Sequence, residues 1–506
     1  MVVHEVRVHK ATERLPREAQ LAWKFAEYGA ALRAVDPDVA EMVACRVIDN
    51  AAVALAAVNR QPVVTARAMA LAHPRPGGAT LFGLPAATEV HAEWAAWANA
   101  TAVRELDFHD AVTPGGHPGD NIPTLLAVAQ QTGRSGAELV RGLAVAYEVQ
   151  VALCRYIPLV PHEVDQFAHL APATAAGLCA LLGLPAPVAF QAINLAVHLA
   201  ISTTQNRKGK ITSWKAFAPG YYGKMAIEAV DRAMRGEAAP SPIYEGEVSV
   251  IATILGGPET RYAVAFPAVG EPPRAILETY TKAYSAVIYA QAFIDLAFEL
   301  RRGLNLAEVA EIVVHTSRTV HRGVGSGADD PEKYDPRASR ESLDHSLPYI
   351  LAVALEDGRW HHEESYAPER VQRPETVALW QKIRTAEDPA WSERFRHPDP
   401  SRREFGGRIE IRLADGRVVA GELGVAHAQP RGKHPWGFEQ YAGKFRTLTE
   451  GLLPPAAGEA FLALAHGLSG LGAADLRRLN PELPPGRVAP PPEGVRGIFD
   501  HPSGAR

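Results

Sequence analysis

The sequence predicts a mainly α-helical protein in which a large helical domain is interrupted by a smaller α+β domain. Three observations support this fold class: residues 1–270 read as one helix after another, strands begin near Pro267, and helices return after about residue 430. Spacings of three and four between apolar residues favour helices, whereas alternation favours strands. We therefore expect a helical domain over 1–270, an inserted α+β domain over 271–430, a helical return over 431–480 that packs on the first domain, and an extended Pro/Gly-rich tail over 481–506.

The helices of the first part carry recognisable signals. The stretch 15–32 has helical periodicity after an early proline, and 35–58 opens with an Asp-Pro pair, which is a typical helix start. The stretch 135–154 begins with a serine–glutamate capping box and continues as an apolar stripe. The stretch 171–184 is so rich in small apolar residues that we expect a fully buried helix.

The inserted part has a different pattern. AEIVVHTS, at 310–317, predicts a strand, and GRIEIRLADGRVVAGEL, at 407–423, predicts a hairpin with its turn at an Asp-Gly pair. Helical stretches such as 348–358 lie between them, and 458–468 begins the helical return. Strands mixed with helices in one block favour an α+β arrangement.

The bulk composition narrows the function classes. The chain has 506 residues, a net charge of −5 and 47% hydrophobic residues, so it can build large cores. No basic block is present, which argues against a nucleic-acid partner. No apolar run approaches about 18 residues, which argues against a membrane span. The first residues lack the apolar segment of a signal peptide, so we expect a cytoplasmic protein.

The cysteines do not form a cofactor motif. Cys45, Cys154 and Cys179 lie far apart in apolar helical stretches, where we expect buried, reduced thiols. Because no CxxC pair is present, an iron–sulfur hydro-lyase is a poor alternative for this chain.

Four segments carry more titratable side chains than a helical scaffold needs. The first, ELDFHDAVTPGGHPGDN at 105–121, holds three aspartates and two histidines among glycines and prolines. Glycines let the backbone approach a ligand closely, and loops between helices often carry sites. Asp107 and His117 are the candidates in this segment, with a solvated loop and capping aspartates as the simpler alternative.

The second and third segments add a histidine and lysines. DQFAHLAPATAAG places His169 directly before the most apolar stretch, where a satisfied core histidine is the alternative. QNRKGKITSWKAFAPGYYGK holds four of the 11 lysines, with Arg207 beside them. Because arginine is the commoner cation elsewhere, a retained lysine indicates a compact ammonium with an adjustable pKa. We select Lys215, at the start of an apolar helix, over Lys210, which lies in a polar stretch.

The fourth segment is divided between YTKAYSAVIYAQ and EKYDPRASRESLDHSLPY. It offers a further set of titratable and cationic side chains, namely Lys282, Tyr284, Tyr334, Arg337, Asp344 and His345. A polar domain surface is the alternative. Taken together, the four segments predict a cationic pocket with histidines and an aspartate, which suits a polycarboxylate substrate and proton transfer beside a carboxylate.

Four stretches, in this order, resemble the MmgE/PrpD family. They are ANATAVRELDFHDAVTPGGHPGDNIPTLLAVAQ, HLAPATAAG, WKAFAPGYYGK, and KYDP followed by SRESLDHSLPYILAVALEDG. The resemblance covers roughly residues 10 to 470. It implies a helical domain built from both ends of the chain, an inserted α+β domain, a homodimer, and no required metal or organic cofactor.

The resemblance also implies which residues form the site. The family's motifs fall on Asp107, His117, His169, Lys215, Lys282 and Tyr334. The family often has DFDDT where this chain has DFHDA, so His109 and Ala111 depart from the pattern. Ser285 and Tyr289 stand where relatives often carry a proline and a histidine.

The implied activity is the dehydration of 2-methylcitrate to 2-methyl-cis-aconitate in propionate catabolism. In this hypothesis His117 is the base and His169 the acid on the leaving hydroxyl, although the two labels could be exchanged. Asp107 would orient His117 or Lys215. Lys215 and Lys282 would neutralise the developing negative charge, with Arg207 as a more distant cation. Tyr334 would donate a hydrogen bond to a substrate carboxylate.

Other activities stay open. Relatives decarboxylate cis-aconitate or epimerise iminodisuccinate, and hydration of citrate or aconitate is a related possibility. A helical scaffold without catalysis is the alternative from another class, but lysines kept in an arginine-rich chain argue against it. Since ligand sites prefer domain interfaces, we expect one cavity between the two domains, lined by His117, His169, Lys215, Lys282 and Tyr334.

Overall fold

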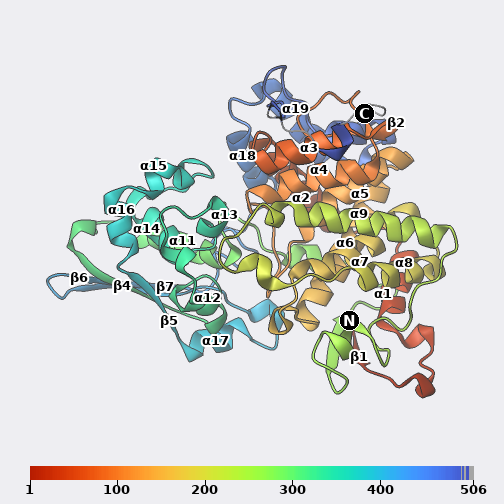
Figure 1. Cartoon of the computed structure of the whole chain (residues 1–506), viewed down its shortest axis with the longest axis horizontal. Coiled ribbons are helices and arrows are strands. Elements are labelled where there is room, and N and C mark those ends of the chain that lie inside the picture. Colours follow the sequence, from red (N-terminus) through yellow and green to blue (C-terminus); the bar gives the residue numbers. More distant parts are fainter. Residues whose placement is uncertain (492, 495–496, 501–506) are drawn as a thin grey trace.

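The computed structural model describes residues 1–491, 493–494 and 497–500, so part of the predicted tail lies outside the described residues. The described chain forms two parts side by side, each around its own hydrophobic core (Figure 1). We call them the helical part and the α+β part. The predicted fold class, mainly α with a smaller α+β component, is confirmed.

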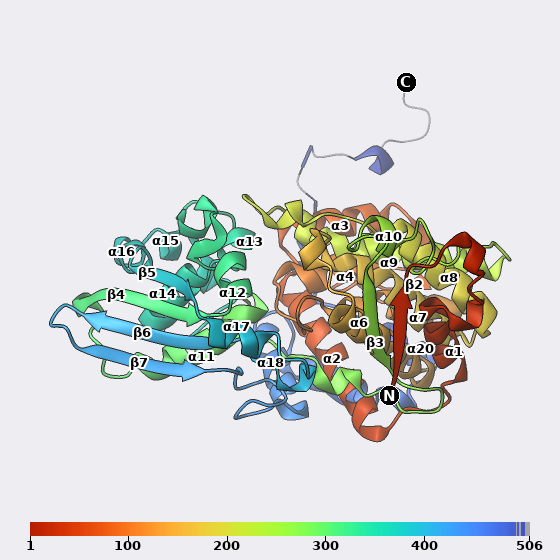
Figure 2. The same cartoon turned by 90° about the horizontal axis from the view of Figure 1, so that it is seen from below.

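The helical part contains most of the long helices. Along the chain they are α1 (Leu21–Ala31), α2 (Pro37–Ala56), α3 (Gln61–Leu71), α4 (Ala92–Glu105), α5 (Asn121–Thr132), α6 (Gly136–Tyr156), α7 (Leu170–Leu182), α8 (Ala186–Leu199), α9 (Trp214–Met234) and α10 (Val250–Thr253). Two short strands at its edge, β1 (Val2–Arg7) and β3 (Arg261–Phe266), pair antiparallel (Figure 2). The remaining strand of this part is β2 (Pro74–Ala79).

The centre of the helical part is the pair α6 and α7. The capping box predicted for α6 is present, because Ser135 accepts from the Glu138 N–H and the Glu138 carboxylate accepts from the Ser135 N–H. The two helices meet at Gly142 and Gly177, where a Cβ on Gly142 would lie 2.9 Å from the Gly177 carbonyl oxygen. Small residues therefore let these backbones approach closely, and all but the last residue of α7 are buried.

Helices from the end of the chain complete the same core. They are α18 (Phe438–Leu448), α19 (Pro455–His466) and α20 (Ala473–Leu476). In Figure 1, α18 and α19 lie beside α2, although they are hundreds of residues apart in the sequence. Phe445 of α18 is fully buried and stacks on Phe461 of α19. The core of the helical part thus contains residues from both ends of the chain.

The α+β part is built on a four-stranded sheet of order β5-β4-β6-β7. The strands are β4 (Val309–Thr316), β5 (Ile383–Glu387), β6 (Gly407–Leu413) and β7 (Val418–Leu423). Only the β4–β5 pair is parallel, and the predicted hairpin is formed by β6 and β7. The helices of this part are α11 (Gln291–Leu300), α12 (Arg318–Gly323), α13 (Arg340–Leu343), α14 (Leu347–Asp357), α15 (Pro368–Val371), α16 (Pro374–Trp380) and α17 (Pro389–Phe395).

Two segments of the helical part cross to the α+β part and fix the junction. Ala111, in the loop after α4, exchanges both backbone hydrogen bonds with Tyr280, at 2.9 and 2.7 Å. Ile211, in the loop before α9, accepts from the Ser339 hydroxyl at 2.9 Å and donates to Ser342 Oγ at 3.2 Å. The loops that carry the chemical motifs are therefore held against the neighbouring part.

No described helix combines the length and hydrophobicity needed to cross a membrane. Cys45, Cys154 and Cys179 are buried and free, and burial raises the pKa of each thiol to about 12.

Candidate active site

Buried charged side chains gather where the two parts meet. Their common features are low exposure and mutual ion pairs; the members are Arg104, Asp107, Lys215, Lys282, Arg340 and Asp344. They come from the ends of α4 and α13, the start of α9, and the segment before α11. His117 and His345 lie at the edge of this group. We call these eight residues the charged cluster.

Asp107 is the centre of the charged cluster. Its backbone is left-handed, with φ of 48°, a region that aspartate enters more readily than most residues. Its carboxylate lies 2.8 Å from Arg104 Nη1, 2.9 Å from Lys282 Nζ and 3.6 Å from Lys215 Nζ. Burial alone would raise the pKa of this carboxyl, but the charges of Lys215, Lys282 and Arg104 hold it well below its usual range. Asp107 is therefore an ionised anchor for cations.

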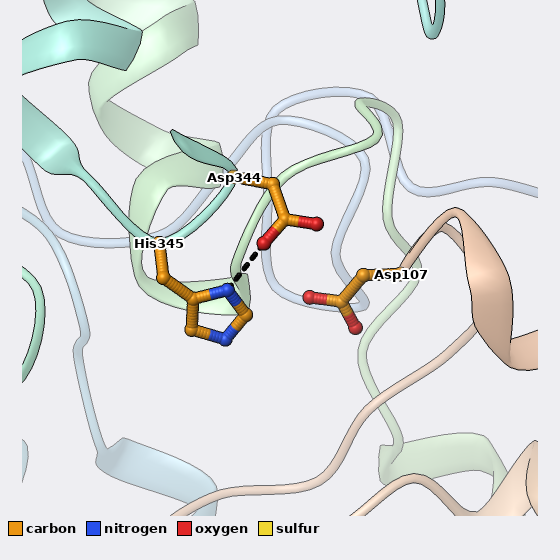
Figure 3. Close-up of side chains that lie close together, drawn as sticks. All are labelled: Asp107, Asp344 and His345. Carbon is orange, nitrogen blue, oxygen red and sulfur yellow. Dashed lines mark hydrogen bonds and ion pairs between the residues drawn. The ribbon is translucent and has the colours of Figure 1, made fainter. Parts of the chain in front are cut away.

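Lys215 occupies the space between carboxylates from the two parts. Its ammonium lies 2.8 Å from both oxygens of Asp344, 3.4 Å from His345 Nδ1 and 3.6 Å from Asp107 Oδ2. Figure 3 shows the side chains of Asp344 and His345 facing that of Asp107. These three are a possible metal-ligand set by geometry. As arranged they do not fit a metal ion, because the Lys215 ammonium already supplies the positive charge among them.

The ammonium of Lys282 has a pKa that its surroundings shift. It is fully buried, and its Nζ donates to the Asp107 carbonyl at 2.8 Å as well as pairing with the Asp107 carboxylate. Desolvation lowers its pKa to about 8, with Asp107 opposing the shift and Arg104 adding to it. Lys282 is therefore mostly charged at neutral pH but can lose its proton within a physiological range.

His117 is held as a neutral imidazole with a defined tautomer. Its Nδ1 lies 2.8 Å from the Asp110 carbonyl oxygen, which can only accept, so Nδ1 carries the proton. Nε2 then bears a lone pair, 3.9 Å from Asp107 Oδ1. Burial, and then the nearby cations Arg104 and Lys282, hold the pKa of His117 well below its usual range. This arrangement has the features of a general base.

Asp344, His345 and Arg340 stand in the fourth segment but were not selected from the sequence. Arg340 Nη1 lies 3.2 Å from Asp344 Oδ2, and the His345 ring contacts the same carboxylate. Burial opposes ionisation of Asp344, but Lys215 and His345 hold the pKa of its carboxyl below the usual value. Burial and Lys215 lower the pKa of His345 to about 4. The Asp-His pair in SLDHSLPY was the available signal, although the sequence gives no partner for it.

His169 lies immediately before α7, as predicted, and is buried. Its Nε2 lies 2.7 Å from the Ile157 carbonyl oxygen, so this nitrogen carries the proton and Nδ1 has the lone pair. Burial lowers the pKa of His169 to about 4, which leaves the ring neutral at neutral pH. In this geometry the single ring proton is hydrogen-bonded to the Ile157 carbonyl and is not free to be donated to a substrate. Its predicted role as the acid stays a prediction.

The structure does not bring Tyr334 or Arg207 into the charged cluster. The Tyr334 hydroxyl donates to the Ile383 carbonyl at 2.7 Å, and its partly buried ring stacks on Trp380 at the edge of the α+β core. Arg207 lies 3.6 Å from Asp165 and packs on Phe167. Arg104 of the charged cluster packs near the same Phe167 ring, so Arg207 reaches the cluster only indirectly. The substrate-binding roles of both residues stay predictions.

The positions that depart from the family pattern have partners of their own. His109 is fully buried with its Nε2 2.8 Å from Asp120 Oδ1. Ala111 contributes backbone bonds to the junction, as described above. The Tyr289 hydroxyl donates to the Pro114 carbonyl at 2.7 Å, and Ser285 Oγ accepts from Trp360 at 3.3 Å. His109, Ala111 and Tyr289 are therefore built into the packing around the loop 107–120, whereas Ser285 bonds within the α+β part.

A cavity of about 750 Å³ opens at the junction, outside the charged cluster. Its lining includes Arg60, Lys210, Ser213, Ser339 and Glu341. Arg60 of this lining pairs with Glu105, the last residue of α4, at 2.6 Å from its Nε. Of the five residues expected in one cavity, three, namely His117, Lys215 and Lys282, meet around Asp107, whereas His169 and Tyr334 make their hydrogen bonds elsewhere.

Comparison with known proteins supports the resemblance. The MmgE/PrpD N-terminal domain matches residues 23–263, and the MmgE/PrpD C-terminal domain matches residues 284–469. A mitochondrial 2-methylcitrate dehydratase of Yarrowia lipolytica is 25% identical over 385 residues, which is 72% of this chain and 72% of that protein. A probable 2-methylcitrate dehydratase of Saccharomyces cerevisiae is 24% identical over 354 residues, covering 63% of this chain and 64% of that protein.

Proposed function

The chain belongs to the MmgE/PrpD family, and on this premise we propose that it is a lyase that dehydrates 2-methylcitrate to 2-methyl-cis-aconitate. The observation that carries the proposal is a neutral histidine, His117, set beside the buried ammonium groups of Lys215 and Lys282 around one carboxylate. The names of the two relatives support the choice of substrate.

The reaction needs cations next to a weakly acidic C–H bond. A proton leaves a carbon that bears a carboxylate, and negative charge spreads onto the carboxylate oxygens before the neighbouring hydroxyl departs. Fixed cations at this point stabilise the developing charge more strongly in a dry site than in water. Lys282 and Lys215 are buried and positioned by Asp107 and Asp344, so they do not need to reorganise.

His117 is the proposed base. Its Nδ1 proton is held by the Asp110 carbonyl, so Nε2 is the nitrogen that accepts the substrate proton. A trianionic substrate would add negative charge beside the ring and oppose the shift that the cations cause in the free protein. The base is therefore strengthened by the molecule on which it acts.

The leaving hydroxyl needs a proton donor. His169 can supply one only if its bond to the Ile157 carbonyl breaks or the ring gains a second proton. Lys282 is a second candidate, because its pKa of about 8 keeps a proton available at neutral pH. Its ammonium and His117 Nε2 both lie within 3.9 Å of Asp107 Oδ1, on the same anchor.

We test the proposal by following alkene formation in the ultraviolet with 2-methylcitrate, with and without a chelator. We expect turnover that survives chelation and is lost in His117→Asn. Parallel assays with citrate, cis-aconitate and iminodisuccinate separate dehydration from the other activities of the family. Turnover of only one of these would reassign the substrate, and no turnover or binding of any polycarboxylate would favour a scaffold.

Two properties implied by the resemblance are part of the proposal. We propose that the chain works as a homodimer and needs no organic cofactor. Sedimentation at several concentrations tests the first point. Activity of protein refolded from denaturant in cofactor-free buffer tests the second, and its failure to regain activity would contradict it.

A further inference from the structure

Lys444 is a buried lysine in α18, far from the charged cluster in sequence. Its Nζ donates to the Phe108 carbonyl at 2.5 Å and to the Lys282 carbonyl at 3.2 Å, and it pairs with Asp49 Oδ1 at 2.7 Å. Two of the three N–H donors of this ammonium thus go to backbone carbonyls, and Asp49 supplies the opposite charge beside them. The Lys444 ammonium is therefore engaged by three groups of the protein itself.

The two carbonyls bound by Lys444 belong to the backbone that carries the proposed chemistry. Phe108 directly follows Asp107, whose left-handed backbone needs support from its surroundings. The other carbonyl belongs to Lys282 itself. One ammonium thus ties together the two chain segments whose side chains form the Asp107–Lys282 ion pair at 2.9 Å.

The neighbouring residues on α2 and α18 act on the same segment. Arg46 of α2 donates to the Thr279 carbonyl at 3.2 Å and to the Thr281 hydroxyl at 3.2 Å. It also donates to the Tyr441 hydroxyl of α18 at 2.7 Å. Residues 279–282 are therefore held from one side by two helices of the helical part. Burial lowers the pKa of Lys444, while Asp49 opposes that shift and keeps the pair together.

We propose that Lys444 is a positioning residue that sets the separation of Asp107 and Lys282 by binding the backbone of both segments. This inference rests on the proposed function. A shift of about 1 Å in a reacting group can cost about a hundredfold in rate. Loss of Lys444 should therefore lower kcat far more than it changes KM.

Lys444→Met is the test, and Arg67→Met is its matched control. Arg67 is also buried and binds two carbonyls, those of Val58 and Ala489, but it touches no residue of the charged cluster in the described structure. We expect Lys444→Met to lower kcat about 10- to 100-fold with KM within about threefold, by the positioning argument above. Arg67→Met should lower Tm and leave both constants near wild type.

Hydrogen exchange gives a readout that does not depend on turnover. In Lys444→Met, amides in 107–112 and 279–284 should exchange faster than in wild type, while β4 and β6 should be unchanged. Arg67→Met should not have this effect. If Lys444→Met exposes a buried, unpaired Asp49 and fails to fold, the double variant Asp49→Asn/Lys444→Met removes both charges and is measured in its place.

The outcomes are distinct. Wild-type kcat and wild-type exchange in a folded Lys444 variant would overturn the proposal, as would an equal loss of kcat in Arg67→Met. If the wild-type protein converts no polycarboxylate, the proposed function fails. The exchange of the two segments then still decides whether Lys444 holds them together.

Discussion

Lys210 and Lys215 lie five positions apart in one basic stretch, yet they are in opposite environments. Lys210 is exposed on the loop before α9 and lines the outer cavity. Lys215 lies in the first turn of α9, is 1% exposed, and is enclosed by Asp107 and Asp344. The difference shows that position in a basic motif does not by itself give a lysine a catalytic environment. Burial and neighbouring carboxylates strengthen the electrostatic interactions of one ammonium, whereas water screens the charge of the exposed one.

The largest effect should come from removing the base in the buried region. His117→Ala should lower kcat by about 10²–10⁴, as expected for a positioned general base. The fold should persist, because the ring makes one hydrogen bond, to the Asp110 carbonyl. His169→Ala is the comparison, and we expect a smaller loss because its ring proton is already bound. Steady-state kinetics and circular dichroism check both variants, and near-normal turnover in His117→Ala would remove it from the mechanism.

The next effect sharpens the contrast between the two lysines. Lys215→Met should lower kcat by about 10²–10³, comparable to the loss of one preorganised electrostatic donor. It should also destabilise the fold, since Asp344 loses its closest cation. The measurement is kcat/KM beside a thermal melt. Activity equal to that of Lys210→Met would show that burial of Lys215 has no catalytic value.

The pH profile tests the third cation. Lys282 stabilises negative charge only while protonated, and its pKa is about 8. Its contribution is therefore present at neutral pH and lost as the pH rises through about 8, so kcat/KM should fall on the alkaline side. Assays from about pH 6 to 9.5 would locate this limb. A flat profile up to pH 9.5 would contradict the assignment.

The smallest effect belongs to the exposed region. Lys210→Ala should change kcat by less than about twofold, as surface charges contribute little. Any change should appear in KM and diminish with added salt, because Lys210 faces the outer cavity and can only attract an anionic substrate from a distance. A salt-independent loss of kcat would place Lys210 in the chemistry after all.

The fold class and four residues of the site could be predicted from the sequence. The change of pattern near Pro267 and the β6–β7 hairpin predicted the fold class, because periodicity reports which face of an element is buried. Asp107, His117, Lys215 and Lys282 were selected from motifs, and the structure brings them together.

The partners of these residues could not be predicted. Lys215 meets Asp344 across 129 positions, and Lys444 meets Phe108 across 336. Local spacing contains no information about such pairs. Lys444 reads as a polar residue on an amphipathic helix, and only the packing of α18 on α2 shows that it is buried. Tyr334 is the converse case: the motif selects it, and packing gives its hydroxyl a partner that the sequence does not show, the Ile383 carbonyl.

The closure of the helical core by α18 and α19 also has a consequence for how the chain acquires its structure over time. During synthesis, α2 leaves the ribosome long before α18 and α19, which cover part of its apolar face. About four hundred further residues must be synthesised before these two helices can pack on it. Contacts of such long sequence separation slow folding and leave surface open to aggregation meanwhile. In refolding of the full chain, amides of α2 and α18 should become protected in the same late phase, measurable by pulsed hydrogen exchange. Early protection of α2 alone would show that its neighbours α4 and α6 suffice to shelter it.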